Sequence, residues 1–278
     1  MLKGVPAIVL AVSAGLGASQ APGAKPDVST RAVVAAASRY VVEFEKQFAF
    51  LVADESSEQR VDGRDAIGPF RRRLTSELFL TYLPADGEWI AIRDVLDIDG
   101  TPVARQQTVR DLLAKADERS VAQQVLKANA RYNLGSVERN FNEPTLPLLL
   151  LEPKRVGRVR FDRRAVARQP DATLVTLSFE EPDVLTLVGG PLGAVPSRGE
   201  LVIDAATGAV RRTLFTLRKR DIRVRLETLY EFNDRLKLWL PSVFHERYER
   251  TGETREVTTV ESRYENYRRF ETSGRIGK

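Results

Sequence analysis

Alternation of apolar and charged side chains is clearest in the segment DIRVRLETLYEF, residues 221–232. Every second position carries an uncharged and mostly apolar side chain: Ile222, Val224, Leu226, Thr228, Tyr230 and Phe232. The positions between them are Arg223, Arg225, Glu227, Leu229 and Glu231. Because successive side chains of a strand point to opposite faces, this period predicts a β-strand with one apolar face and one solvated face.

The same period of two recurs through most of the chain after residue 156. Turn sequences such as 204–208, 218–221 and 233–235 are short, so strands that follow each other should lie side by side and antiparallel. Upstream, a turn at 84–87 predicts a hairpin. The predicted strands are 78–83, 89–98, 158–161, 173–179, 184–188, 200–203, 209–217, 222–232, 237–240 with 244–250, and 256–270.

Three segments have helical character. Apolar residues recur at steps of three and four over 30–49 and predict an amphipathic helix. Residues 105–131 predict two further helices, and Pro144 suits the first turn of a short one. The leucines of 148–151 have no polar face, so this run is either buried or covers an apolar surface.

These elements predict an α+β fold that is mainly β. A sheet this wide curls, so we expect a large curved antiparallel sheet, half-barrel-like, with the helices packed on its concave face. The expected organisation is a signal peptide at 1–21, a flexible linker at 22–29, a single domain at 30–270 with a helical insert at 105–155, and a disordered tail at 271–278.

The N-terminal sequence MLKGVPAIVLAVSAGLGASQAPGAKP predicts export. Lys3 supplies a positive start, residues 5–18 form a short apolar run, and small residues follow. Cleavage after Ala18 or Ser19 would release a periplasmic or secreted protein. An uncleaved membrane anchor is the alternative, which the shortness of the run disfavours.

Composition excludes several chemistries. The chain has 43 basic and 38 acidic residues without a recognisable nucleic-acid module, so no nucleic-acid partner is expected. It has no Cys, which removes disulfides, thiolate nucleophiles and Cys-type metal sites. His245 is its one His, so a two-His metal site within the chain is impossible. We therefore expect neither a metal nor a cofactor.

Candidate catalytic motifs are weak. His245 lies in a solvated strand without a nucleophile elbow. The DVLDIDG segment, residues 94–100, lacks the spacing of a calcium loop and reads as a strand that ends in a turn. Glu180 and Glu181 offer half of a carboxylate pair without a partner, and VGGPLG at 188–193 is not a phosphate loop. The protein is therefore expected not to be an enzyme.

The apolar faces of the later strands are the candidate site. If the helices are too few to cover the concave face, a hydrophobic groove is left there for an apolar ligand, an acyl chain or a lipoprotein segment. The alternative is a structural or protein-interaction domain with a filled core and no small ligand. Peripheral association with a membrane is left open. The candidate ligand-binding residues are Val224, Leu226, Tyr230, Phe232, Phe244 and Tyr248.

Two sequence stretches support a resemblance. GELVIDAATGAVRRTLFTL (199–217) and LETLYEFNDRLKLWLPSVFHERYE (226–249) resemble periplasmic lipoprotein-localisation carriers, the outer-membrane lipoprotein carrier and its receptor. This resemblance covers about 156–270. RYNLGSVERNFNEPT (131–145) is similar to a segment of uncharacterised secreted bacterial proteins. The resemblance implies a curved sheet that binds acyl chains or lipoproteins on its concave face.

Overall fold

The structure is a computed structural model. It describes residues 26–47, 50–63, 70–83, 88–104, 106–137, 139, 143–184, 186–190, 193–252 and 255–270. The predicted signal peptide, residues 22–25 of the predicted linker and the predicted tail at 271–278 lie outside the described residues.

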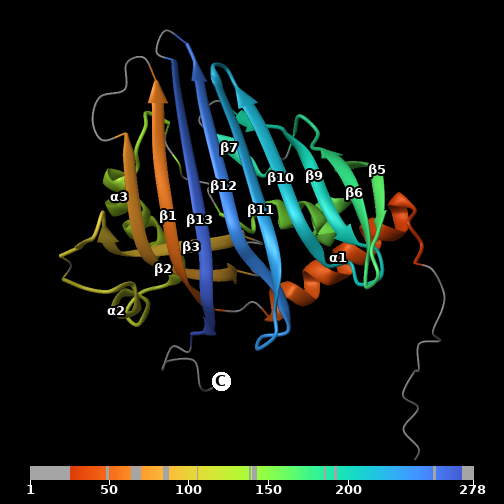
Figure 1. Cartoon of the computed structure of the whole chain (residues 1–278), viewed down its shortest axis with the longest axis horizontal. Coiled ribbons are helices and arrows are strands. Elements are labelled where there is room, and N and C mark those ends of the chain that lie inside the picture. Colours follow the sequence, from red (N-terminus) through yellow and green to blue (C-terminus); the bar gives the residue numbers. More distant parts are fainter. Residues whose placement is uncertain are drawn as a thin grey trace, which may run out of the picture.

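One antiparallel sheet of eleven strands forms the body of the molecule, in the order β4-β3-β2-β1-β13-β12-β11-β10-β9-β6-β5 (Figure 1). The mainly β, α+β fold predicted from the sequence is confirmed. A separate hairpin consists of β7 (Val188–Gly190) and β8 (Gly193–Val195). The strands of the large sheet are β1 (Leu51–Gly63), β2 (Arg71–Leu83), β3 (Glu88–Ile98), β4 (Thr101–Pro102), β5 (Arg160–Arg168), β6 (Thr173–Glu180), β9 (Ser197–Asp204), β10 (Val210–Lys219), β11 (Ile222–Asn233), β12 (Leu238–Thr251) and β13 (Arg255–Arg269).

Most neighbouring strands follow each other in the chain, as the short turns predict. There are two exceptions: β6 pairs with β9, with the β7–β8 hairpin between them in the chain, and β1 pairs with β13, which joins the first and last strands over most of their length. Among the described residues of the predicted strand 184–188, only Val188 belongs to a strand, and Val184 lies in the loop between β6 and β7. Residues 237–240 and 244–250 belong largely to the single strand β12.

Helices lie on both faces of the sheet. They are α1 (Thr30–Gln47), α2 (Val109–Leu113), α3 (Glu118–Asn129) and α4 (Pro153–Val156), with the 3-10 helices η1 (Ala130–Tyr132) and η2 (Leu146–Leu151). None of the described helices is both long and apolar enough to span a bilayer. Helix α1 and η2 pack on the concave face, where they share one large hydrophobic core with the sheet (Figure 1).

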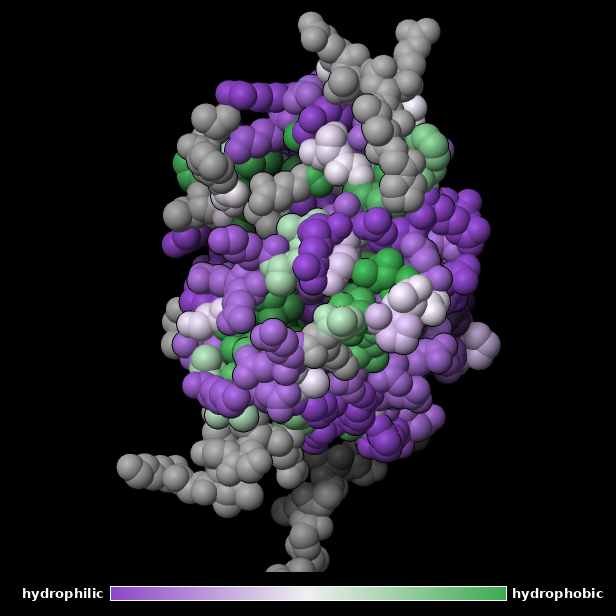
Figure 2. Space-filling view, turned by 90° about the vertical axis from the view of Figure 1, so that its left-hand side faces the viewer, coloured by the Kyte–Doolittle hydropathy of each residue, from purple (hydrophilic) through white to green (hydrophobic). Residues whose placement is uncertain are grey.

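The expectation that segment 108–131 also covers the concave face is wrong. Helices α2 and α3 contribute Val109, Val121 and Val125 to a second, smaller core, which lies on the opposite face of β1, β2 and β3. The side chains of Ile90 and Ile92 point into this core, while the alternate position Trp89 belongs to the large one. On this side of the molecule some apolar side chains are exposed at the surface among hydrophilic ones (Figure 2).

A tight turn brings the sheet against α1. Gly208, in the turn between β9 and β10, has a φ of +78°, and a Cβ on it would lie 2.2 Å from the carbonyl oxygen of Ala36. Both the backbone conformation and the close approach therefore require glycine. The small side chains Ala36 and Ala37 face this turn from the helix, and both are buried. This contact holds α1 across the concave face.

Candidate functional site

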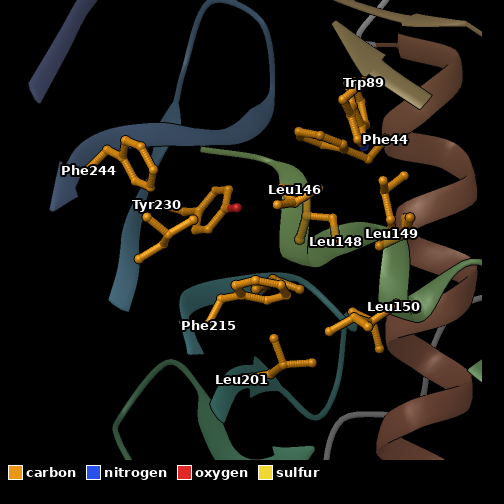
Figure 3. Packing of buried hydrophobic residues seen from close by; sticks show 14 of the residues in the cluster. Phe44, Trp89, Leu146, Leu148, Leu149, Leu150, Leu201, Phe215, Tyr230 and Phe244 are labelled. Atoms are coloured by element: carbon orange, nitrogen blue, oxygen red, sulfur yellow. The ribbon is translucent and has the colours of Figure 1, made fainter. Parts of the chain in front are cut away.

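The concave face carries an apolar region on β6, β9, β10 and β11. Leu177 pairs with Leu201, Phe215 pairs with Leu226, and all four side chains are buried. Over them lies η2, whose sequence is LPLLLL and whose six residues are all buried. Leu146 and Leu148 point towards the sheet side and Leu149 and Leu150 lie against α1 (Figure 3). We call η2 the plug, since it fills the space between the sheet and α1.

Five of the six predicted ligand-binding residues belong to this core. Val224, Leu226, Tyr230, Phe244 and Tyr248 are at most 5% exposed. Their face is therefore closed in the free protein, where these residues share one core with the plug and α1, and the guanidinium of Arg139 lies 5.9 Å from the ring centroid of Tyr248. The structure thus places these residues together, as the sequence predicts, but under a cover rather than in an open groove.

Phe232 corrects the predicted set. Its side chain is 44% exposed and packs beside Trp239 at the end of β11, with ring centroids 5.6 Å apart. The register shift between Leu229 and Tyr230 leaves Ser242 of β12 unpaired, so the phase of β11 is unchanged and Tyr230 still points inward. Phe232 shares this phase but is the second-to-last residue of β11, where the strand leaves the core. The period of two therefore gives the face correctly, while the burial ends before the last predicted position.

The plug is held to its surroundings by apolar contacts. Among the described residues, no hydrogen bond joins 146–151 to the sheet or to α1. The carbonyl oxygen of Pro144, before the plug, accepts hydrogen bonds from Thr228 Oγ1 at 2.8 Å and Tyr230 Oη at 3.0 Å. A 3-10 helix of six residues is longer than usual, and its hydrogen-bond geometry is intrinsically poor. The burial of the leucines is thus the main contribution that keeps the plug in place.

A group of carboxyls fastens the other end of the plug. Tyr82 Oη donates to Glu152 Oε1 at 2.6 Å, and Arg155 Nε lies 3.2 Å from Glu152 Oε2. Glu45 of α1 lies beside Glu152. Burial, followed by the charge of Glu152, raises the pKa of Glu45 to about 7. Helix, plug and sheet therefore meet at a group that titrates near neutral pH.

Next to the apolar region lies a polar cluster formed by Glu55, Arg93, Glu246, Tyr248 and Tyr264. Arg93 Nε donates to both carboxylate oxygens of Glu55 at 2.9 Å, and Tyr248 Oη donates to Glu246 at 2.5 Å. Glu55 and Glu246 are only 2% and 3% exposed. Burial lowers the pKa of Arg93, but the charges of Glu55, Tyr264 and Glu246 outweigh it and raise that pKa overall.

Sequence reasoning missed this polar cluster. A signal existed for Glu246, since it stands between Phe244 and Tyr248 and shares their inward phase. No comparable signal existed for Glu55 and Arg93, because only the pairing of β1 with β2 and of β2 with β3 brings them together. Their bidentate ion pair neutralises two charges that would be costly to bury singly.

Over β11, β12 and β13 the outer face of the sheet is charged and solvated, as predicted for these strands. It contains an open depression of about 550 Å³, lined by basic and acidic side chains of β1, β11, β12 and β13. His245 lies there, with Nδ1 3.8 Å from Glu261 Oε2 and with 44% of its side chain exposed. Arg225, Arg247 and Arg263 each form an ion pair with an acidic residue of their own strand.

The other candidate carboxylates have local structural partners. Asp97 accepts a hydrogen bond from the backbone of Gly100 at 2.7 Å, and Asp99 accepts one from the backbone of Arg73 at 2.7 Å, both at the turn after β3. Glu181 accepts bonds from Ser197 N at 3.1 Å and Ser197 Oγ at 2.6 Å. Among the described residues, no group of three or more His, Asp or Glu side chains is arranged to hold a metal.

No protein-family profile and no curated protein matches the chain. Solved structures that it resembles include an outer membrane lipoprotein-sorting protein domain from Vibrio parahaemolyticus, with a TM-score of 0.36, 12% identity, and coverage of 88% of this chain and 94% of that one. A DUF1329 family protein from Desulfovibrio piger has a TM-score of 0.35, 9% identity and the same coverages. The lipoprotein LppX of Mycobacterium tuberculosis has a TM-score of 0.23 and 7% identity, covering 88% of this chain and all 100% of its own.

Proposed function

We propose that the protein is an exported, non-enzymatic binding protein that holds an apolar ligand on the concave face of its sheet. The ligand is an acyl chain or a lipoprotein segment, and it takes the place that the plug occupies in the free protein. The observation that supports this most is the plug itself: six buried apolar residues without a hydrogen bond to the sheet or to α1 among the described residues.

Contacts of this kind can be exchanged. The hydrophobic effect is non-directional, so an acyl chain that covers Leu201, Phe215 and Leu226 restores the burial that is lost when the plug leaves. No unpaired backbone group would remain on the sheet, because the plug makes no backbone hydrogen bond with it. Only molecules with a displaced plug can bind. The apparent dissociation constant is therefore the intrinsic constant divided by the fraction of such molecules.

A probe-binding experiment tests the proposal. The fluorescence of a polyunsaturated fatty acid is titrated with wild type and with a Leu148→Ala/Leu150→Ala variant, whose plug packs less well. We expect the variant to bind roughly tenfold more tightly, because more molecules expose the site. The matched control is Ile92→Ala, which removes a comparable buried side chain from the core on the other face of the sheet. This variant should bind the fatty acid within about twofold of wild type, because a substitution far from the site does not couple to it.

A second function is favoured by the near-complete burial of the five predicted residues. If the plug is a permanent part of the core, the protein is a structural or protein-interaction domain in the cell envelope. Folded wild type and folded plug variant would then both fail to bind the fatty acid. That result would refute the binding proposal.

Export is the part of the proposal that rests on the N-terminal sequence. The positive residue Lys3, the apolar run 5–18 and the small residues after it are typical of a signal peptide. We expect the mature protein from its native host to begin between residues 19 and 25. N-terminal sequencing checks this, and an intact Met1 on a cytosolic protein would contradict it.

A further inference from the structure

The segment 154–168, which comprises most of α4 and all of β5, contains seven basic residues and one acidic residue, Asp162. We call this segment the basic edge. Segment 211–225 has the same balance of charges, but there Arg211, Arg212 and Arg225 form ion pairs with carboxylates. A dense group of exposed basic side chains indicates a surface that can face an anionic partner.

The basic edge lies at the rim of the sheet. Strand β5 is the last in the strand order and pairs only with β6 (Figure 1). Its burial pattern has no buried position, in contrast to β6, β9 and β10. The arginines of the basic edge that are exposed to solvent are Arg158, Arg160, Arg163, Arg164 and Arg168.

Several of these arginines lack a neutralising partner. Among the described residues, no ion pair joins Arg158, Arg164 or Arg168 to a carboxylate, and Arg164 donates only to Ser178 Oγ at 2.8 Å. Arg160 differs, since it pairs with Glu180 and Asp162. On the outer face of the sheet, Arg225, Arg247 and Arg263 each have an acidic partner. The rim thus carries positive charge that no carboxylate of the described residues neutralises.

The geometry of β5 disfavours a peptide partner that adds a strand. The pairing of β5 with β6 has a register shift between Arg163 and Ala165. Bulges and charged side chains on an edge strand are the devices by which proteins prevent edge-to-edge pairing. The nine residues of β5 span about 30 Å at ~3.3 Å per residue, which suits a flat surface.

We propose that the basic edge docks on a bilayer surface that carries anionic lipids. The guanidinium groups would contact the phosphates of the headgroups, which arginine binds in a bidentate manner. This inference goes beyond the proposed function, because it needs no ligand on the concave face. The two surfaces are nevertheless adjacent: Arg155 of the basic edge contacts Glu152, the residue that follows the plug.

Co-sedimentation with vesicles tests the proposal. The mature protein is mixed with vesicles of phosphatidylcholine alone or with phosphatidylglycerol added, at low and high salt. We expect binding only to the anionic vesicles, decreasing as salt screens the charges. The variant Arg158→Gln/Arg164→Gln/Arg168→Gln should bind on the order of tenfold to a hundredfold more weakly, because each basic residue near the surface contributes to binding.

The matched control removes the same charge elsewhere. Arg225→Gln/Arg247→Gln/Arg263→Gln lowers the net charge equally on the outer face, and we expect it to bind within about twofold of wild type, since attraction to the surface falls off within a Debye length. Thermal melts of both triple variants verify that they are folded. Equal weakening by both would show a dependence on net charge alone and would overturn the proposal. Absence of wild-type binding, equal binding to uncharged vesicles, or binding to immobilised polyglutamate but not to vesicles would overturn it too.

Discussion

The apolar region and the polar cluster lie side by side on one concave face, and they are held together in different ways. The boundary runs between β11 and β12, where Leu226 pairs with Glu246 and Val224 pairs with Tyr248. On the β11 side, leucines of the plug cover leucine and phenylalanine side chains. On the β12 side, the buried carboxylates accept hydrogen bonds from Arg93 and from the hydroxyl of Tyr248.

Because of this difference, a ligand can replace the contacts of the plug but not those of the polar cluster. Apolar contacts depend on area and shape, so another apolar body can replace the plug. The polar cluster depends on direction and charge, and removing one member leaves the others buried without compensation. A ligand site is therefore expected over the apolar region, while the polar cluster keeps the strands β1, β12 and β13 in position.

The largest effect is expected from a charge in the apolar region. Leu226 is 1% exposed, so Leu226→Glu buries a carboxylate next to Glu246 and should cost about 4 kcal/mol or more, enough to unfold a marginal domain. Urea denaturation followed by circular dichroism measures this. Leu229→Glu is the control, since Leu229 is 36% exposed on the same strand and should change stability by only about 0.5 kcal/mol. A fully stable Leu226→Glu protein would show that the region is an open groove rather than covered.

Breaking the polar cluster should have the next largest effect. Arg93→Met leaves the carboxylate of Glu55, which is 2% exposed, without its bidentate partner and should cost about 3 kcal/mol. The double variant Arg93→Met/Glu55→Leu removes both charges and should recover most of that loss. A double-mutant cycle of unfolding free energies measures the coupling. If the double variant is no more stable than Arg93→Met, the ion pair is not what the cluster requires.

Weakening the hydrogen bonds at Pro144, just before the plug, should lower the stability moderately. Tyr230→Phe removes one of the two hydrogen bonds to the carbonyl oxygen of Pro144 and leaves the bond from Thr228. The expected loss of stability is about 1 kcal/mol. Binding of the fatty-acid probe should become slightly stronger, since the plug leaves more readily. Unchanged stability and affinity would mean that this bond does not restrain the plug.

The smallest effect concerns pH. The pKa of Glu45 is raised to about 7 in the folded protein from 4.5, so the folded state holds a proton that the unfolded state releases. Its contribution to stability is therefore present below about pH 4.5 and is lost as pH rises towards and beyond 7. Solvent screening at this half-buried group limits the effect to about 1 kcal/mol.

Glu45→Gln mimics the protonated form and isolates this effect. Wild type and variant should be equally stable near pH 5, and the variant should be the more stable protein at pH 8.5. Melting temperatures across this range give the comparison. A constant difference between the two proteins from pH 5 to 8.5 would exclude titration of Glu45.

Local patterns predicted a large part of the fold. The period of three to four over 30–49 found α1 to within two residues of its end, and the turn at 204–208 was placed between the correct strands. The period of two brought five of the six candidate residues onto one buried face. Phe232 is exposed because it lies at the end of β11, beyond the core, and the alternation of a strand does not mark where its burial ends.

What the sequence by itself determined is which side chains share a face, where turns fall, and that no cysteine chemistry is available to this chain. These properties follow from the period of the backbone and from composition, and both are local. The tertiary structure alone decided that β1 lies beside β13, that α2 and α3 cover the outer rather than the concave face, and that Glu55 meets Arg93. It also decided that the leucines of the plug fill the concave face. Apolar burial has no direction, so an apolar run contains no information about which of two apolar faces it will cover; that depends on the contacts of the whole chain.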